Sequence, residues 1–404
     1  MIQRFDFTTK NLANSVPMES NICLFSRREA ENAPSEGKGM SRAKRPVMLV
    51  GGVPGNSAEE VFRVVAPIVG DLAIGLTDGE FGLRRFWIFF VAINTWDKHP
   101  DVELIRPNPQ PMLGFPEWLP PDYHACPWWG PKPGVQKLRP IETLGYPDEA
   151  LASYKVFCQQ RDQGVIPRGV RFQQSLPFPD DAVRVFTNNA HNMDVMVDGY
   201  IDVMKRDVAK LCQQIPHEDL VLQWDINWET VALEHGDYMP DVPPMQFKPN
   251  GDPMERFVRY IRELNAPIPK TVPVGMHLCY GDLHHKHFKD PADLATSVKM
   301  ANKAAEISPR PISHVQMSVP RNRSDDKYFE PLEDLRIGDA TVYAGLVHYT
   351  DGVEGSRKRL AAFERHFAGM TGVATECGLG RRPKDQQLTK LLEIHRDVAA
   401  AIRA

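Results

Sequence analysis

From Pro46 onward, short apolar runs alternate with longer segments in which apolar residues recur every three or four positions. The short runs have the length of buried strands, and the longer segments have the period of amphipathic helices. The runs expected to form strands are residues 47–54, 72–80, 170–177, 220–229, 272–281, 312–321, 341–350 and 372–380. The segments expected to form helices are residues 58–69, 148–161, 192–213, 253–264, 291–307, 355–367 and 385–402.

Strands that alternate with helices predict parallel pairing through right-handed crossovers. Eight such strands predict the α/β class and a (β/α)8 TIM barrel, as one domain over residues 46–404. A doubly wound open sheet is the weaker alternative, because no glycine-rich dinucleotide-binding motif follows the first run.

Two segments do not follow this alternation. Residues 85–169 contain the proline- and tryptophan-rich stretch RPNPQPMLGFPEWLPPDYHACPWWGPKPG, and we expect them to form an insertion between strands 2 and 3, as a lid or cap over the site. Residues 1–45 are polar and without apolar periodicity, which predicts a disordered tail. A mitochondrial presequence is the less favoured interpretation of this tail, because acidic residues interrupt its basic pattern.

Composition narrows the class of protein. Hydrophobic residues make up 42% and charged residues 25% of the 404 residues, as in a globular protein with a large core. A formal net charge of -4 gives no sign of a nucleic-acid or membrane partner. The six cysteines are widely scattered and no secretory signal is evident, so we expect reduced thiols and a cytoplasmic location. The sequence does not indicate the oligomeric state.

Chemically reactive side chains stand where the predicted strands end. In a barrel of this kind, functional groups gather at the carboxyl ends of the strands. The residues in question are Asp78 and Glu80 on strand 2, Asp225 and Glu229 on strand 4, His277 and Cys279 on strand 5, Ser318 and Arg321 on strand 6, His348 on strand 7, and Cys377 on strand 8.

The stretch TVPVGMHLCYGD, residues 271–282, suggests a metal site. Positions i and i+2 of a strand share a face, so His277 and Cys279 project together. Cys377, at the end of strand 8, belongs to the same rim, and zinc prefers such Cys and His ligands. The alternative is that the cysteines are inert core residues and that the histidine is merely hydrogen-bonded.

At these residues the chain resembles the carboxyl-terminal barrel of the cobalamin-independent methionine synthase family, within the uroporphyrinogen decarboxylase/methionine synthase-like superfamily. HLCYGD (277–282) is similar to the family's His-x-Cys pair, and ECGLGRR (376–382) to its Asp-Cys-Gly-Leu motif. TDGE (77–80) is similar to His-Gly-Glu, and QWDINWE (223–229) in part to Gln-Ile-Asp-Glu-Pro. His348 matches a histidine at the end of the family's seventh strand.

The resemblance implies a zinc-dependent methyl- or alkyltransferase that activates a thiol. In this family, zinc held by residues matching His277, Cys279 and Cys377 binds the homocysteine thiol as a thiolate, which attacks the methyl group of a folate. The partners implied are therefore a small-molecule thiol and a methyl donor. Glu80 and Asp225 would hold the substrate's amino group, with Asp78, Glu229, Ser318 and Arg321 as further substrate-binding candidates, and His348 would be the acid. The alternatives are a salt bridge for the two acids and a supporting hydrogen bond for His348.

The chain departs from the family at three places. Ser318 stands where the family has a glutamate ligand of zinc, while Arg321 keeps the arginine, and Asp282 is a candidate substitute ligand. Gly52 stands where the family's first strand has a substrate-binding serine, and no tryptophan follows strand 3. The true donor and acceptor are therefore left open. A zinc-dependent lyase or hydrolase on the same barrel is the alternative function.

Overall fold

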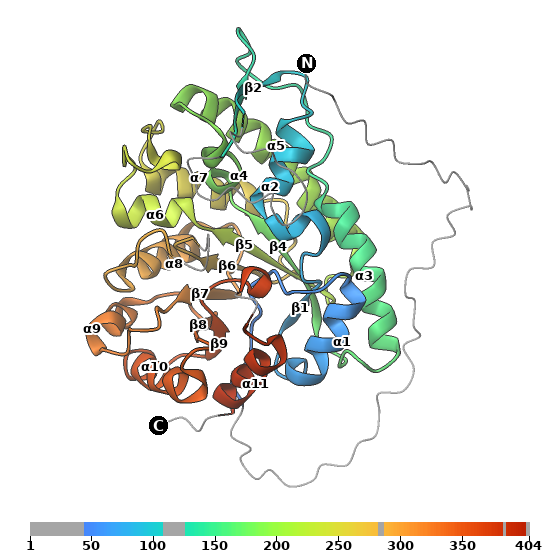
Figure 1. Cartoon of the computed structure of the whole chain (residues 1–404), viewed down its shortest axis with the longest axis vertical. Coiled ribbons are helices and arrows are strands. Elements are labelled where there is room, and N and C mark those ends of the chain that lie inside the picture. The colour runs from blue at the N-terminus through green and yellow to red at the C-terminus, as the bar shows by residue number, and fades with distance from the viewer. Residues whose placement is uncertain (1–43, 108–125, 282–286, 383–384, 401–404) are drawn as a thin grey trace. The chain divides into compact units, whose positions relative to one another are not determined.

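A curled parallel sheet is the centre of the structure, which is a computed structural model. It describes residues 44–107, 126–281, 287–382 and 385–400, all within one unit, Arg42–Ala404. Seven strands pair in the order β1-β4-β5-β6-β7-β8-β9, and every neighbouring pair is parallel (Figure 1). Their bounds are β1 Gly75–Thr77, β4 Arg171–Pro177, β5 Leu220–Ile226, β6 Val274–Leu278, β7 His314–Ser318, β8 Thr341–Val347 and β9 Thr371–Thr375.

The first predicted strand, residues 47–54, is present as a bridge and not as a regular strand. Val47 forms parallel bridges with both Ala73 and Val373, so it joins the two edges of the sheet. Its backbone N–H donates to the Leu72 carbonyl, and Met48 N–H donates to the Val373 carbonyl. The curled sheet closed in this way is consistent with the predicted barrel.

Helices surround the sheet and also form a closed series. Those predicted from the sequence are α1 Ala58–Val69, α3 Tyr146–Asp162, α5 Ala190–Gln214, α7 Pro253–Asn265, α8 Ala295–Ile307, α10 Gly352–His366 and α11 Leu388–Ala399. From α1 to α8 each helix of this series packs on the next, α8 and α10 both contact the 3-10 turn Glu330–Asp334, α10 packs on α11, and α11 packs on α1. Local signals explain several boundaries: the side chains of Ser57, Asn189 and Asp252 accept hydrogen bonds at the N-termini of α1, α5 and α7. None of the described helices is both long enough and apolar enough to cross a membrane.

The segment between β1 and β4 contains more regular structure than the sequence predicted. A 3-10 turn, Gly82–Phe86, is followed by α2 Ile88–Val91 and a π-helical turn, Ala92–Trp96. An antiparallel pair, β2 Val102–Arg106 and β3 Trp128–Pro131, then precedes α3. Residues 108–125 of the proline-rich stretch lie outside the described residues, and its role as a lid stays a prediction.

Most of the predicted tail, residues 1–43, also lies outside the described residues. Arg45, the last residue of that tail, is buried, and its guanidinium pairs with Glu364 of α10 at 2.7 Å. Its backbone N–H donates to the Ala399 carbonyl of α11. Arg45, although assigned to the tail from the sequence, therefore packs on α10 and α11.

Candidate metal centre and active site

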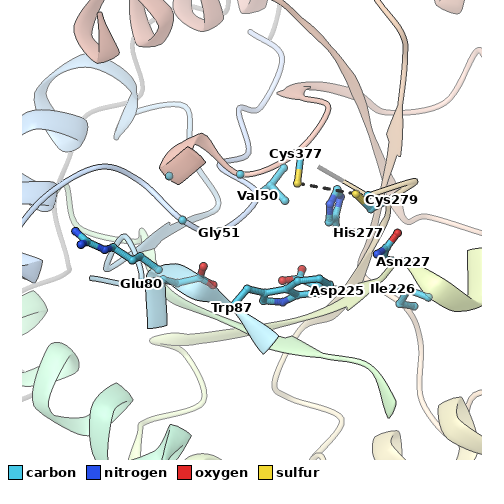
Figure 2. Close-up of a pocket in the computed structure, with 15 residues that line it drawn as sticks. Val50, Gly51, Glu80, Trp87, Asp225, Ile226, Asn227, His277, Cys279 and Cys377 are labelled. Atoms are coloured by element: carbon cyan, nitrogen blue, oxygen red, sulfur yellow. Dashed lines mark hydrogen bonds between the residues drawn. The ribbon is translucent and has the colours of Figure 1, made fainter. Parts of the chain in front are cut away.

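Three side chains predicted as zinc ligands lie together at the carboxyl ends of β6 and β9. His277 is in β6, Cys279 directly follows β6, and Cys377 lies two residues after β9. One ligand atom of each residue lies within 4.8 Å of the others. The two sulfur atoms are 3.9 Å apart (Figure 2). The sheet thus brings Cys377 to a pair that is 98 residues away in the chain.

The imidazole of His277 is buried and has one defined partner. Its Nδ1 is 2.5 Å from Oε1 of Gln316. Its Nε2 has no hydrogen-bond partner among the described residues. Burial lowers the pKa of His277, but the neighbouring Cys377 and Asp225 and the contact with Gln316 outweigh it and raise this pKa to about 9. A metal cation that binds such a group displaces its protons, because the ligands that bind are the neutral imidazole and the thiolates.

The donor set fits zinc. Two thiolates and an imidazole are ligands that zinc prefers, and three protein ligands leave one coordination position for water or substrate. The buried Nε2 atom without a partner supports this, because such atoms in folded proteins usually have one. His277, Cys279 and Cys377 are the residues that would hold the ion. Asp282, the candidate substitute ligand, lies outside the described residues.

Two predicted carboxylates line the same pocket. Glu80 and Asp225 lie along one side of it, with Trp87 between their labels in Figure 2, and the His277–Cys279–Cys377 group lies on the other side. Asp225 is the penultimate residue of β5 and accepts a hydrogen bond of 2.7 Å from Nε2 of Gln223. The pocket therefore combines a soft donor set with negative charge suited to a cationic group of a substrate.

Glycines allow Glu80 to reach the pocket. A Cβ atom at Gly51 would lie 3.1 Å from Oε1 of Glu80, and one at Gly52 would lie 3.3 Å from Oε2. Gly52, which has no side chain, thus leaves space for this carboxylate. Among the described residues, Glu80 and Trp87 are the non-glycine residues with positive φ, both 53°. Strained backbone of this kind is often found at functional sites, and both residues line the pocket.

His348 and Arg321 belong to a neighbouring hollow that shares Cys377 with this pocket. Nε2 of His348 lies 2.9 Å from the Val319 carbonyl, so this nitrogen carries the proton that it donates. Nδ1 lies 3.6 Å from Oε2 of Glu376. Burial, together with the charge of Arg359, lowers the pKa of His348 to about 4. The imidazole is therefore neutral at pH 7.

Asp78 and Ser318, two further candidates, contact residues near the pocket and are not among those that line it. Burial would raise the pKa of Asp78, but an ion pair with Arg84, 2.7 Å long, holds it below its usual value. Asp78 also accepts the backbone N–H of Glu80 at 2.9 Å, which stabilises the turn that carries Glu80. The hydroxyl oxygen of Ser318 lies 3.2 Å from the Leu278 carbonyl and 2.9 Å from the Glu376 carbonyl, so its one proton can be donated either to the end of β6 or to the residue that follows β9.

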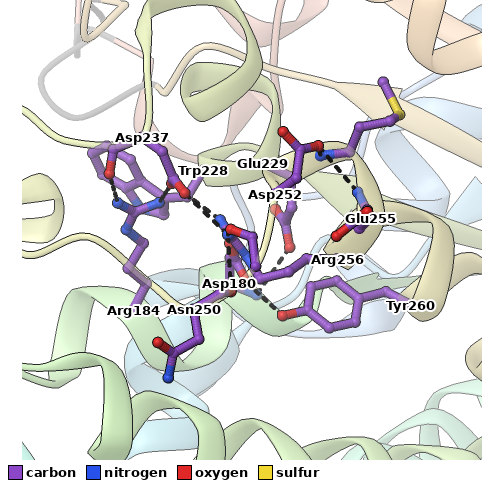
Figure 3. A network of polar contacts seen from close by, with 12 residues as sticks. Asp180, Arg184, Trp228, Glu229, Asp237, Asn250, Asp252, Glu255, Arg256 and Tyr260 are labelled. Carbon is purple, nitrogen blue, oxygen red and sulfur yellow. Dashed lines mark hydrogen bonds and ion pairs between the residues drawn. The ribbon is translucent and has the colours of Figure 1, made fainter.

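Glu229 lies in a buried network and is not among the residues that line the pocket (Figure 3). The chain leaves β5 at Ile226 and enters helix α6, Trp228–His235, so Glu229 is helical. Its Oε1 accepts the backbone N–H of Asp180, while Asp181 accepts those of Asn227 and Trp228. Burial, and then repulsion between the acids, raises the pKa of Glu229 and Asp181. These contacts fix the turn that follows Asp225.

Sequence reasoning missed Gln316, Gln223, Trp87 and Arg85. The two glutamines lie within apolar runs, and their amides hydrogen-bond to predicted site residues, as described above. Arg85 and Trp87 line the pocket from the segment after β1. A polar amide inside a strand otherwise read as buried was the available signal for the glutamines. No sequence pattern pointed to Arg85 or Trp87.

Comparisons with known proteins give structural neighbours alone. No family model and no curated protein matches the chain. A Listeria monocytogenes protein described as a vitamin-B12-independent methionine synthase is similar at a TM-score of 0.49 and 14% identity, over 84% of this chain and 86% of that one. A B12-independent methionine synthase from Shewanella sp. W3-18-1, in complex with selenomethionine, is similar at a TM-score of 0.46 and 12% identity, over 76% and 77% of the two chains. Because both TM-scores lie below 0.5, the proposal below is based on the pocket residues.

Proposed function

We propose that the protein is a zinc-dependent methyl- or alkyltransferase that activates a thiol substrate, similar to a methionine synthase. The observation that carries this proposal is the grouping of His277, Cys279 and Cys377 within 4.8 Å, in a pocket that also contains Glu80 and Asp225. A thiol is mostly protonated at neutral pH, and bound zinc would stabilise its nucleophilic thiolate. The acceptor would be homocysteine or a related thiol, and the donor a folate or another methyl donor.

The protein residues have separable roles in this proposal. His277, Cys279 and Cys377 hold the ion. Glu80 and Asp225 bind the substrate's ammonium group and so orient its thiol toward the ion.

The nitrogen that loses a methyl group needs a proton, and His348 is the candidate donor. Its Nδ1 faces Glu376, so a proton gained on that atom would be held between the two side chains. Because the pKa of His348 is about 4, Nδ1 carries no proton at pH 7, so His348 would have to take up a proton after the donor molecule binds before it could pass that proton on. Arg321, which donates to Thr350 at 3.1 Å in the same hollow, would bind an anionic part of that molecule.

The experiment that tests this function compares turnover of methyl donors with and without an added thiol, using the zinc-loaded protein. Methyl transfer requires the thiol and yields one thioether for each donor consumed. Donor consumption at an unchanged rate without thiol would reject the transferase and favour the hydrolase or lyase alternative.

Replacing Glu80 with glutamine is expected to weaken binding of an amino-thiol by roughly 1–3 kcal/mol, the range for a hydrogen bond to a charged group. Zinc content should stay unchanged, because Glu80 is not one of the three grouped ligands. The measurement is a titration with homocysteine and with 4-mercaptobutanoate, which lacks the amino group. Glu80→Gln should affect the first thiol alone.

Glu59→Gln is the matched control, because it removes the same charge from the exposed face of α1, where Glu59 pairs with Arg63. If Glu80→Gln lowers the melting temperature and leaves the affinity for both thiols unchanged, Glu80 has a structural role and the amino-acid substrate is wrong.

A further inference from the structure

The amide of Gln316 connects both halves of the candidate metal centre. Gln316 is fully buried in β7, and it pairs in register with His277 of β6. Its Oε1 contacts Nδ1 of His277 at 2.5 Å. Its Nε2 donates to the carbonyls of Thr375 and Glu376, at 2.8 and 3.3 Å, in the two residues directly before Cys377.

These hydrogen-bond partners determine the orientation of the Gln316 amide and the nitrogen of His277 that carries the proton. The carbonyls of Thr375 and Glu376 can only accept, so the NH2 group of the amide must face them. The amide oxygen then faces His277 and requires a proton on Nδ1. In the neutral imidazole, the lone pair is consequently on Nε2, the atom that has no hydrogen-bond partner among the described residues.

The neighbouring strand leaves space for this amide. Gly345 of β8 has no side chain, and a Cβ atom there would lie 2.3 Å from Nε2 of Gln316. The close approach of the amide to the β8 backbone therefore depends on a glycine at this position.

We propose that Gln316 is a positioning residue of the metal centre, which sets the tautomer of His277 and holds the β9 end so that Nε2 and the Cys377 thiolate face one ion. This inference rests on the metal centre of the proposed function. It assigns a role to a residue that does not itself touch the ion, as is usual for the partner of a metal-binding histidine.

The alternative is that Gln316 only donates hydrogen bonds to buried carbonyls and has no role at the metal centre. Gln173 of β4 provides a control for that role, because its buried Nε2 donates to the Leu49 carbonyl at 2.8 Å. The hydrogen bonds described for the Gln173 amide go to Leu49, Val50 and Gln223, and none of them goes to His277. Gln173→Leu and Gln316→Leu therefore each remove a buried amide, but only the second removes the acceptor for Nδ1.

The test measures zinc affinity by competition with a chelator, the visible absorption spectrum of the cobalt(II) form, and the melting temperature without metal. Gln316→Leu should weaken zinc binding about 10- to 100-fold, the usual loss for such a partner. Its cobalt(II) spectrum should change in the ligand-field bands, because the imidazole is no longer held toward the ion, and keep the thiolate charge-transfer band. Gln316→Glu should rescue both properties, since a buried protonated carboxyl group can accept from Nδ1–H and donate to the Thr375 carbonyl.

The outcomes separate the two proposals. If the wild-type protein binds neither zinc nor cobalt(II), the metal centre of the proposed function fails. If the wild-type protein binds them and Gln316→Leu has the affinity and spectrum of Gln173→Leu, the positioning role of Gln316 is overturned while the metal centre stands. Should Gln316→Leu fail to fold, Gln316→Glu decides. If Gln316→Glu has the melting temperature of the wild type but binds zinc more weakly, the expected rescue fails and the role proposed for Gln316 is overturned.

Discussion

Replacing Cys279 or Cys377 with serine is expected to remove most of the bound zinc and to reduce thiol-dependent turnover in proportion. The hydroxyl of serine does not ionise near neutral pH, so each change deletes one of two anionic ligands from a set of three. The loss of zinc affinity should exceed the roughly 10- to 100-fold effect typical of residues that only support a ligand. Elemental analysis of the purified variants measures the zinc per chain, for which we expect about one in the wild type.

Cys212→Ser is the matched control. Cys212 is also buried, in α5, but it is not one of the three grouped residues, and burial raises the pKa of its thiol to about 11. This variant should keep its zinc. Full zinc occupancy in both Cys279→Ser and Cys377→Ser would show that the three residues do not form the metal centre.

Lowering the pH from 6.5 to 4 is expected to destabilise the protein by roughly 3 kcal/mol for each of two buried histidines, His314 and His395. Burial lowers the pKa of each from the ordinary 6.5 to about 4, and each pKa unit corresponds to about 1.4 kcal/mol. Nε2 of each has no hydrogen-bond partner among the described residues, so no acceptor there would stabilise the doubly protonated, charged imidazole. Between pH 4 and 6.5 the unfolded chain binds more protons than the folded one, so the free energy of unfolding falls as the pH falls.

Chemical unfolding of His395→Gln at several pH values measures this effect. Nδ1 of His395 donates to the Leu391 carbonyl within α11, and glutamine can keep that bond. The variant should lose less stability than the wild type between pH 6.5 and 4. His366→Gln should have its effect above pH 6.5 instead, because hydrogen bonds to Glu333 and Asp326 outweigh burial and raise the pKa of His366, so the stability that this histidine contributes is lost as the pH rises through the raised pKa. Parallel curves for wild type and His395→Gln would contradict the prediction.

The repeated strand–helix pattern was predictable because it depends on local periodicity and capping. Helix α1 has the predicted bounds, Ala58–Val69, and α7 begins at the predicted Pro253, after its capping residue Asp252. The region between β1 and β4 was less predictable. Its helical turns are too short to show a helical period in the sequence. The strands β2 and β3 pair although they are far apart in the chain, so no local pattern predicts their pairing.

The pocket shows the same division. Glu80 and Asp225 were expected at strand ends and both line the pocket, but Glu229, only four residues after Asp225, faces a buried network. The change of direction occurs because β5 ends at Ile226 and α6 begins at Trp228. The sequence predicted a strand up to residue 229, and this prediction did not include the turn. Asp181 stabilises the turn by accepting two backbone N–H groups.

The sequence by itself determined which residues could serve as soft ligands and that His277 and Cys279 share one face, because the alternation of a strand is a property of its backbone. The sequence also predicted Cys377 as the third ligand, but only the tertiary structure decided how near it lies to this pair and that Gln316 supplies the acceptor for Nδ1 of His277. Both depend on how β6, β7 and β9 lie across the curled sheet and on the register His277↔Gln316. The alternation within each strand decides which face a side chain occupies, but which residues of two strands far apart in the chain lie side by side depends on the packing of the whole unit.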